Sequence, residues 1–353
     1  MIISRTPYRI SFFGGGTDYP DWYLQNGGHV ISTTIDKYVY ISCRYLPPFF
    51  DHKLRFVYSR IEAVNNSSEL IHPSAREILR HLGIKNGLEI HYDGDLPGRS
   101  GMGSSSAFSA GLLNTLHHYK GRTIPKENLA RETIHIEQKI LKEAVGSQDQ
   151  ISAAYGGLNH IRFLTNSTIE VSPLEIECSV RKNLNDSLML FFTGIVRSAS
   201  DVASSILSSL DKNNSELKQI GNLVEQGIDI LKGERNIDDF GRLLHQVWVL
   251  KRRLSGAVSN SKIDHIYDRA LSAGALGGKI MGAGGGGFLL LYVKQGRQED
   301  VRRSLSEFHN VPFRFSDSGS EIIFSCPDQE YPLEEKRREE YAKNMTIENS
   351  RIQ

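Results

Sequence analysis

The stretch that most constrains this chain runs from Asp95 to Phe108 and reads Asp-Leu-Pro-Gly-Arg-Ser-Gly-Met-Gly-Ser-Ser-Ser-Ala-Phe. Alternation over 88–93 favours a strand before it, and the Ala- and Leu-rich segment 107–119 favours a helix after it. The glycines lack a Cβ, so positive φ is accessible and backbone N–H groups can approach a ligand closely. With Ser104 as the expected N-cap, the free amides and the positive helix end indicate an anion site, most plausibly for phosphate.

Three known motifs of similar composition do not fit this stretch. A P-loop needs Gly-Lys-Ser/Thr at the helix entrance, but the chain reads Gly103-Ser104-Ser105 there. A dinucleotide fingerprint needs G-x-G-x-x-G, whereas these glycines are spaced G-x-x-G-x-G. The serines do not stand in G-x-S-x-G, which argues against a nucleophile elbow. Taken alone, an ordinary Gly/Ser turn before a helix is the alternative interpretation.

Composition limits the possible partners. The 353 residues suggest about two domains. Lys plus Arg number 42 and Asp plus Glu 41, so a net charge of +1 gives no global field for nucleic acid or membrane. The three cysteines are far apart without C-x-x-C, which argues against zinc and against a disulfide framework. With no apolar run of about eighteen residues and no signal peptide, we expect a cytoplasmic protein with small partners.

Two opposite charges flank a glycine run near the N-terminus. Residues 5–13 alternate so that Tyr8, Ile10 and Phe12 share one strand face, while Arg9 and Ser11 share the other. The strand ends in Gly-Gly-Gly-Thr-Asp at 14–18, where the backbone can approach a ligand. A surface ion pair beside a flexible turn explains the same pattern equally well.

A carboxylate is expected to face inward from a helix over 125–145. Ala130, Ile134, Glu137, Leu141 and Ala144 recur at spacings of four and three, which places Glu137 within the apolar stripe. An inward carboxylate needs a cation or must titrate near neutral pH, and the cation is either a buried Arg or Lys or a metal ion.

The segment after this helix offers a second carboxylate. Asp149 is expected just past the helix C-terminus, among small residues, a position that suits a catalytic acid. Asp is also common in ordinary turns.

The remaining pattern predicts an α+β chain with three parts: 1–187, 188–327 and a charged tail over 328–353, which we expect to be helical. The first part is expected to hold strands over 30–35, 38–44 and 54–58, a helix over 73–81, and short strands with polar turns over 160–187. The second is expected to hold a strand over 188–193, helices over 199–210, 215–232, 236–253 and 261–273, a glycine run at 282–287, a strand over 288–293, a helix near 297–309 and strands near 311–315 and 321–324.

Three glycine-rich segments in this order resemble the three motifs of the GHMP kinases: Arg9–Asp18, Leu96–Ala107 and Lys279–Phe288. The resemblance covers residues 5 to about 325. Within the family, 5–19 and 145–150 look most like the D-glycero-D-manno-heptose 7-phosphate 1-kinases, with L-fucokinase as a near neighbour. The resemblance implies an ATP-dependent sugar kinase with a ribosomal protein S5 domain 2-like N-terminal domain and a ferredoxin-like C-terminal domain. ATP and the sugar would bind in the cleft between them, and a homodimer is possible.

The resemblance also implies site residues. Contact with ATP is implied for Pro97, Gly98, Arg99, Gly101, Gly103, Ser104, Ser105 and Ser106. Ser105 and Glu137 would bind Mg²⁺. Asp149 would be the catalytic aspartate, assisted by Arg9. Gly15, Gly16, Asp18, Gly282, Gly284 and Gly285 would contact the sugar.

Arg99 departs from the family pattern, in which many members have a small residue at this position. Its fork could contact a phosphate of ATP or of the sugar, or it could face solvent. The sequence leaves open whether the sugar is a heptose 7-phosphate, L-fucose or another hexose, and a non-catalytic sugar-binding regulator is the alternative of another class. The basic residues considered for a sugar phosphate are Arg99, Lys37, Arg197, Lys251, Arg252 and Arg253.

Overall fold

The computed structural model describes residues 1–84, 87–195, 199–210, 212–329, 331–338 and 340. Strand β1 (Ile2–Phe13) is the second strand from one edge of the first sheet, and the side chains of Tyr8, Ile10 and Phe12 on one of its faces are fully buried. Arg9 and Ser11 on the other face are also buried, because that face is covered as well. Both faces of β1 therefore contribute to packed interior.

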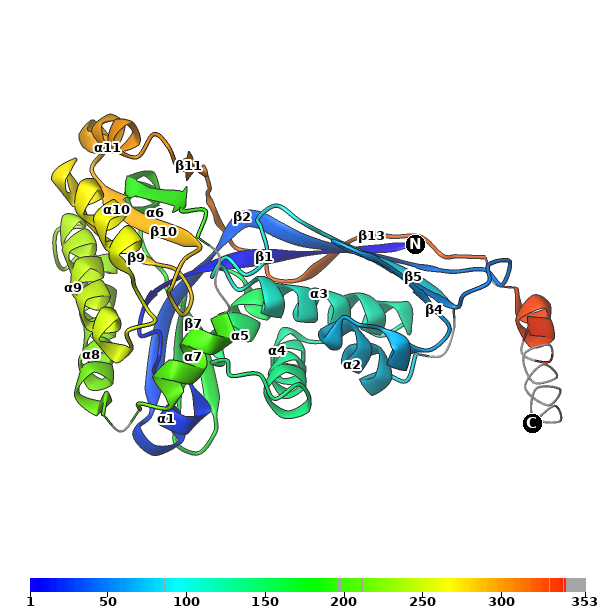
Figure 1. Ribbon diagram of the computed structural model, residues 1–353. Helices are drawn as coiled ribbons and strands as arrows, with labels where there is room; N and C mark the ends of the chain where they lie inside the picture. The colour runs from blue at the N-terminus through cyan, green and yellow to red at the C-terminus, as the bar shows by residue number, and fades with distance from the viewer. Residues whose placement is uncertain (85–86, 196–198, 211, 330, 339, 341–353) are drawn as a thin grey trace.

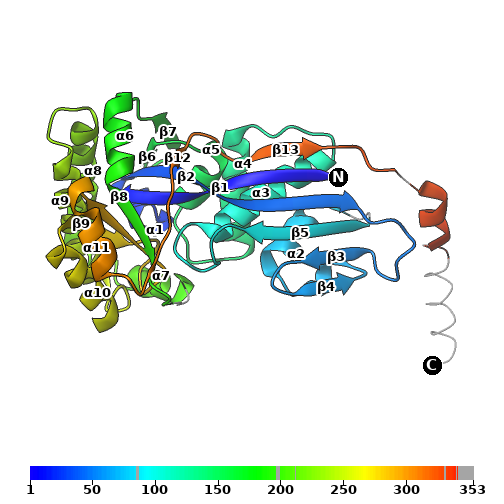
Figure 2. The same ribbon diagram turned by 90° about the horizontal axis from the view of Figure 1, so that it is seen from above.

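The first sheet is mainly antiparallel. Its strand order is β13-β1-β2-β5-β3-β4, with β6 and β12 also pairing with β2, and β7 pairing with β6. Figure 2 shows β13 beside β1, and β3 and β4 at the opposite edge. The strands are β2 (Gly28–Tyr45), β3 (Leu54–Val57), β4 (Ile61–Val64), β5 (Leu88–Gly94), β6 (Asn159–Phe163), β7 (Ile169–Pro173), β12 (Phe315–Ser316) and β13 (Glu321–Ser325).

Helices cover this sheet on one side (Figure 1). They are α2 (Pro73–His81), α3 (Ser104–Tyr119), α4 (Lys126–Ile134), a π-helical turn η2 (His135–Ile140) and α5 (Gln148–Tyr155). The first part of the chain also holds α1 (Pro20–Asn26), a short 3-10 turn η1 (Ser67–Glu69) and α6 (Cys178–Ser187), which lies beside the second lobe. Helix α3 packs on β1 and β2 and is buried over most of its length. This packing fixes the position of the N-terminus of α3, which directly follows the second glycine-rich loop.

The second lobe is a four-stranded antiparallel sheet with helices. Its order is β11-β8-β10-β9. The elements are β8 (Leu188–Phe192), α7 (Ala199–Leu207), α8 (Asn214–Leu231), α9 (Asp238–Leu254), α10 (Ser261–Ser272), β9 (Ala275–Ile280), β10 (Phe288–Val293), η3 (Gln295–Arg297), α11 (Gln298–Ser304) and β11 (His309–Asn310). Helix α8 also packs on β1 and β2, so it joins the two lobes.

Aromatic side chains connect the lobes. The ring of Phe240 on α9 lies edge-on to both Phe12 and Phe13 of β1, with centroid separations of 5.1 and 4.8 Å. Such edge-to-face pairs are stabilising beyond the area that they bury. The two lobes therefore share a continuous apolar core.

The mixed architecture agrees with the α+β prediction, with three differences. The strands expected over 30–35 and 38–44 are one long strand, β2. Helix α6 lies where polar turns were expected; it buries only Leu184 and Ser187, so its apolar period is weak. Strands β12 and β13 return to the first sheet although the division at 187 assigned them to the second part. The tail is helical at 332–338, and most of it lies outside the described residues.

No described helix combines the length and the apolar composition that a membrane span requires.

Candidate active site

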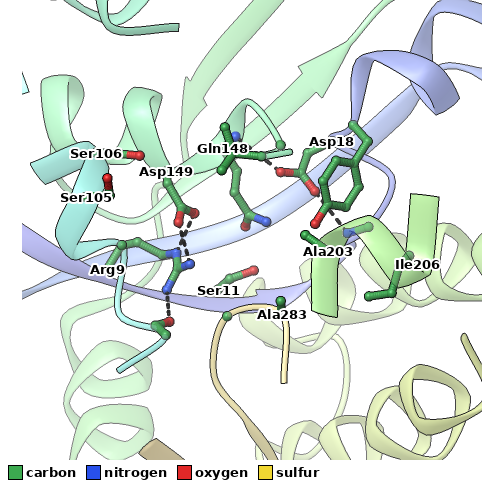
Figure 3. Close-up of a pocket in the computed structure, with 18 of the residues that line it drawn as sticks. Arg9, Ser11, Asp18, Ser105, Ser106, Gln148, Asp149, Ala203, Ile206 and Ala283 are labelled. Atoms are coloured by element: carbon green, nitrogen blue, oxygen red, sulfur yellow. Dashed lines mark hydrogen bonds and ion pairs between the residues drawn. The ribbon is translucent and has the colours of Figure 1, made fainter. Parts of the chain in front are cut away.

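A cleft between the two lobes gathers residues from all three glycine-rich segments (Figure 3). Of the predicted site residues, those that line it are Arg9, Gly15, Gly16, Asp18, Arg99, Gly101, Gly103, Ser104, Ser105, Ser106, Asp149 and Gly282. Pro97, Gly98, Gly284 and Gly285 are close in sequence but are not among its lining residues, and Glu137 lies behind the cleft wall, fully buried.

Arg9 and Asp149 form a two-pronged ion pair at the base of the cleft. Nε of Arg9 donates to Oδ1 of Asp149 and Nη2 donates to Oδ2, each at 2.7 Å. The third prong, Nη1, donates to the carbonyl of Gly101 at 2.6 Å. The Arg9 side chain is 4% exposed and that of Asp149 is 25% exposed. The arginine is thus fixed from three directions while the carboxylate remains open to the cleft.

Asp18, a second carboxylate of the cleft, is held by backbone groups. Its Oδ1 accepts from the Gly16 N–H at 2.9 Å, and its Oδ2 accepts from the Gln148 N–H at 3.3 Å. Burial raises the pKa of Asp18, and the nearby charge of Asp149 acts in the same direction. Asp18 therefore ties the first glycine loop to the start of α5, next to Asp149.

The N-terminus of α3 opens into the cleft without a capping side chain. Its N-cap is Gly103, in the left-handed conformation with φ +77°, and not Ser104, which is the first helical residue. A serine in this conformation would be strained, so the glycine takes the cap position. The first intrahelical bond runs from Ala107 N–H to Gly103 C=O, which leaves the amides of Ser104, Ser105 and Ser106 without an intrahelical acceptor.

Glu137 is inward as its register predicted, and one of its buried oxygens makes no regular hydrogen bond. Its Oε2 accepts from Ser106 Oγ at 2.8 Å and from Gln150 Nε2 at 2.6 Å. Its Oε1 is buried without a hydrogen bond of normal geometry, although the hydroxyl of Ser109 is near enough to act on this carboxyl. Burial raises the pKa of Glu137 to about 7, and the charge of Glu143 adds to this. The sequence left open whether a buried Arg or Lys, or a metal ion, balances Glu137. Among the described residues, no Arg or Lys pairs with it.

The serine that contacts Glu137 is Ser106, whereas the sequence paired Glu137 with Ser105. Ser105 stands one position earlier on α3 and is exposed at the cleft rim. One residue on a helix rotates the side chain by about 100°, which is enough to exchange the inward and outward positions. Metal binding by Ser105 stays a prediction.

The helix expected over 125–145 ends early. Helix α4 passes into the π-helical turn at 135 and the chain leaves the helix near Lys142, whose φ is +56°. Asp149 is consequently not just past a helix end; it lies in the first turn of the separate helix α5. A carboxylate in a first turn is favoured by the helix dipole and by free amides.

Two buried lysines also line the cleft. Nζ of Lys251 donates to the carbonyls of Ile280 and Gly282, and Nζ of Lys279 donates to Phe12 C=O at 3.0 Å. Burial, together with the charge of Arg9, lowers the pKa of Lys251 to about 7, although Asp18 and Asp149 oppose this. Burial, then the charge of Lys251, lowers the pKa of Lys279 well below its usual value. Lys251 was considered from the sequence, but Lys279 was missed because it belongs to a strand of apolar and glycine residues.

Two further polar groups in the cleft also escaped sequence analysis. Ser11 and Gln148 line it, and Ser11 Oγ and Gln148 Oε1 are buried without a hydrogen-bond partner (Figure 3). Buried polar atoms are normally paired, so unpaired ones that face a cleft indicate a polar ligand. The sequence alternation placed Ser11 on the same strand face as Arg9, but it did not identify Ser11 as a residue of the cleft.

The second and third glycine segments touch each other at Gly101. A Cβ on Gly101 would lie 2.5 Å from Met281 O, and its φ is +81°. This contact holds the loop before α3 against the loop after β9, so both segments edge the same cleft.

The basic residues considered for a sugar phosphate separate into groups. Arg99 and Lys251 line the cleft. Lys37 pairs with Asp36, and Arg252 pairs with Asp264. Neither Lys37 nor Arg252 lines the cleft. Arg253 is exposed on another face of α9, and Arg197 lies outside the described residues.

Comparison with known proteins assigns the family. Residues 69–157 match the GHMP kinases N terminal domain, and residues 228–311 match the GHMP kinases C terminal domain. The chain belongs to the GHMP kinases. A D-glycero-alpha-D-manno-heptose 7-phosphate kinase of Campylobacter jejuni is 28% identical, over 86% of this chain and 93% of that protein. An L-fucokinase/L-fucose-1-P guanylyltransferase of Bacteroides fragilis is 26% identical, over 88% of this chain and 36% of that protein.

Solved structures agree with the fold of this GHMP kinase. The crystal structure of a D-glycero-D-manno-heptose 1-phosphate kinase from Bacteroides thetaiotaomicron superposes with a TM-score of 0.74 and 24% identity, covering 92% of this chain and all of that one. Lactococcus lactis galactokinase in complex with galactose superposes with a TM-score of 0.70 and 18% identity, over 91% of this chain and 95% of that one. The two-domain fold expected from the three motifs is confirmed, and the protein is an ATP-dependent sugar kinase.

Proposed function

We propose that this kinase transfers the γ-phosphoryl group of ATP to the anomeric hydroxyl of D-glycero-D-manno-heptose 7-phosphate. The observation that carries the proposal is the Arg9–Asp149 pair, open to a cleft that has unpaired polar atoms on one side and the free amides of α3 on the other. The similarity to the Campylobacter heptose 7-phosphate kinase over most of both chains favours this sugar. The product would be the 1,7-bisphosphate, a precursor for nucleotide-heptose and surface polysaccharide, made in the cytoplasm.

Asp149 would orient the attacking hydroxyl and accept its proton. Its two oxygens are held by Arg9 at 2.7 Å, so the carboxylate cannot rotate, and its exposed edge faces the cleft. General-base assistance of this kind is typically worth about 10² to 10⁴ in rate. The positive charge of Arg9 would also offset the charge that develops on the transferring group.

The N-terminus of α3 fits the phosphates of ATP. Three backbone amides without intrahelical acceptors and the positive end of a 16-residue helix converge on the cleft. Gly101 and Gly103, both at positive φ, let this backbone approach a ligand.

Glu137 fits a Mg²⁺ ion that accompanies ATP. The buried Oε1 of Glu137 makes no regular hydrogen bond and could therefore bind a cation. Mg²⁺ prefers oxygen ligands of this kind. When bound, the ion would neutralise phosphate charge, and Glu137 with a serine of the 104–106 run would hold it.

The sugar would lie against Asp18, Ser11 and Gln148. Asp18 is fixed by backbone amides, and the unpaired oxygens of Ser11 and Gln148 can bond hydroxyl groups. Lys251 and Arg99 are the cleft-lining basic groups available for a phosphate at the far end of the sugar.

The test is ADP release by the purified chain with MgATP and a sugar panel. The panel holds the heptose 7-phosphate, the same heptose without phosphate, L-fucose and galactose, and ³¹P NMR locates the new phosphate. We expect the heptose 7-phosphate to give the highest kcat/KM and a product phosphorylated at C1. A higher kcat/KM with L-fucose, or transfer to any position other than C1, would overturn the substrate assignment.

A further inference from the structure

A second group of metal-ligating side chains lies outside the cleft, behind the first glycine loop. His29, His160 and Glu225 each offer one ligand atom, and these atoms all lie within 4.8 Å of one another. Over the part of the chain that the structure describes, no other three His, Cys, Asp or Glu side chains converge in this way. None of the three lines the cleft.

Strand pairing brings the two histidines together. In the antiparallel β2 and β6 pair, His29 is opposite Arg162 and His160 is opposite Ile31. The histidines are therefore diagonal neighbours on one face of the sheet. Glu225 comes from α8, which packs on this face, so the group joins the second lobe to the first sheet.

The spacing of the ligand atoms matches tetrahedral zinc. Nδ1 of His29 lies 3.3 Å from Nε2 of His160 and 3.4 Å from Oε1 of Glu225. Zinc bonds of about 2.0–2.1 Å at tetrahedral angles separate neighbouring ligands by roughly 3.3 Å. Two of the three separations thus match, the third lies within 4.8 Å, and Glu225 is exposed enough to adjust it.

The proton arrangement also favours a cation. Nε2 of His29 faces Gly221, whose backbone hydrogen-bonds the ring. A ring nitrogen that donates to a carbonyl leaves the other as a lone pair, which is the usual arrangement of a metal-binding histidine. Nδ1 of His29 can then accept a hydrogen bond from Nε2 of His160 in the metal-free protein, and a cation bound between the rings and Glu225 would take the place of that proton.

The surrounding charges are balanced. Arg162 acts on both histidines and Lys232 on His160. Arg162 is paired with Glu170, and Glu225 brings a negative charge to the group. Burial is the largest influence on both histidines, and it lowers the pKa of each.

We propose that His29, His160 and Glu225 form a Zn²⁺ site that clamps α8 to strands β2 and β6, with water as the fourth ligand. Two neutral imidazoles and a carboxylate are a set that zinc accepts. The cysteine spacing argued against zinc, and this site uses no cysteine. The backbone N–H of His29 donates to Oγ1 of Thr17, and this hydroxyl donates to the carbonyl of Gly14. An ion on His29 would therefore also stabilise the loop that carries Asp18.

The experiment is calorimetric titration of the metal-free full chain with Zn²⁺, without nucleotide. We expect one Zn²⁺ per chain. Glu225→Gln should weaken binding at least about tenfold, and His160→Ala about a hundredfold. His265→Ala, an exposed histidine on α10, should bind as wild type does. Glu137→Gln should also retain Zn²⁺ binding, which separates this site from the kinase cleft.

Two further readouts make the outcome decisive. Co²⁺ in place of Zn²⁺ should give the strong visible absorption of a tetrahedral site in wild type and lose it in His160→Ala. Zn²⁺ should raise the thermal midpoint of wild type more than that of Glu225→Gln at the same Zn²⁺ concentration, and the exposed side chain of Glu225 means that this substitution leaves the fold intact. Absence of Zn²⁺ binding by wild type would overturn the proposal. So would a Zn²⁺ affinity of Glu225→Gln and His160→Ala equal to that of wild type.

Discussion

Arg9 and Asp149 stand 140 residues apart in the chain and meet through two parallel hydrogen bonds of 2.7 Å. The arginine is on strand β1 of the first sheet, and the aspartate is in the first turn of a short helix. Fork-to-carboxylate pairs fix orientation as well as charge. The pair therefore holds the proposed base rigidly toward the cleft before any substrate binds.

Asp149→Asn should lower kcat by about 10² to 10⁴ while the chain stays folded, because the amide keeps the shape but cannot accept the proton. Steady-state kinetics with the best sugar and a circular dichroism spectrum test this. Asp268→Asn changes an exposed aspartate on α10 and should leave kcat unchanged. Turnover close to wild type in Asp149→Asn would show that Asp149 is not the base.

Arg9→Lys should lower kcat by about tenfold to a hundredfold despite the conserved charge. A lysine cannot make the two parallel bonds to Asp149 and the third to Gly101, and each bond to a charged group contributes about 1.5–3 kcal/mol. The measurement is kcat at saturating MgATP. If the lysine variant were as fast as wild type, charge alone and not the fork would be sufficient.

Gly101→Ala should destabilise the protein by about 2 kcal/mol and raise KM for ATP. The new Cβ would lie 2.5 Å from Met281 O at a φ of +81°, which strains the contact between the second and third glycine segments. Gly98→Ala is the matched control, because no atom lies within 4 Å of its added Cβ. Urea unfolding and ATP kinetics should separate the two variants, and equal behaviour would contradict the close contact.

Glu137→Gln should stabilise the metal-free protein above neutral pH. Burial raises the pKa of Glu137 to about 7, so between about pH 4.5 and 7 the folded state keeps a proton that the unfolded state loses. Wild-type stability therefore falls over this window as the pH rises, by on the order of 3 kcal/mol. The glutamine variant lacks this contribution.

Unfolding free energies of the two proteins, measured at pH 4.5, 6 and 8 in EDTA, test this expectation. The curves should nearly meet at the lowest pH and diverge toward pH 8, with the variant more stable. Parallel curves would mean that Glu137 is already ionised in the metal-free fold.

The sequence predicted features that depend on local periodicity and failed where the backbone departs from regular geometry. The register of Glu137 follows from helical spacing alone, and this residue is fully buried. The end of that helix was wrong because a π-helical turn at 135–140 and the positive φ of Lys142 have no clear sequence signal. The same departure hid the place of Asp149 at a helix start.

Pairings between distant segments needed the structure. The family resemblance paired Ser105 with Glu137, whereas the serine whose side chain contacts Glu137 is Ser106. Lys279 and Gln148 carry no pattern that distinguishes them from surface residues; only the packing of the two lobes makes them cleft residues. The motif resemblance located the cleft, but not its full set of polar groups.

Arg99→Gly should raise KM for the phosphorylated sugar about tenfold or more, without raising KM for the same sugar lacking the phosphate. Arg99 lines the cleft with a φ of +58°, a conformation that a long side chain rarely adopts and that glycine accepts freely. The variant therefore removes the fork without adding strain, and loss of one charge-assisted contact to phosphate corresponds to about 1.5–3 kcal/mol. Arg122→Gly, an exposed arginine beyond α3, serves as the control for charge and should change neither KM. A rise in KM for ATP alone would assign the fork to the nucleotide, and two unchanged KM values would show that Arg99 binds neither phosphate.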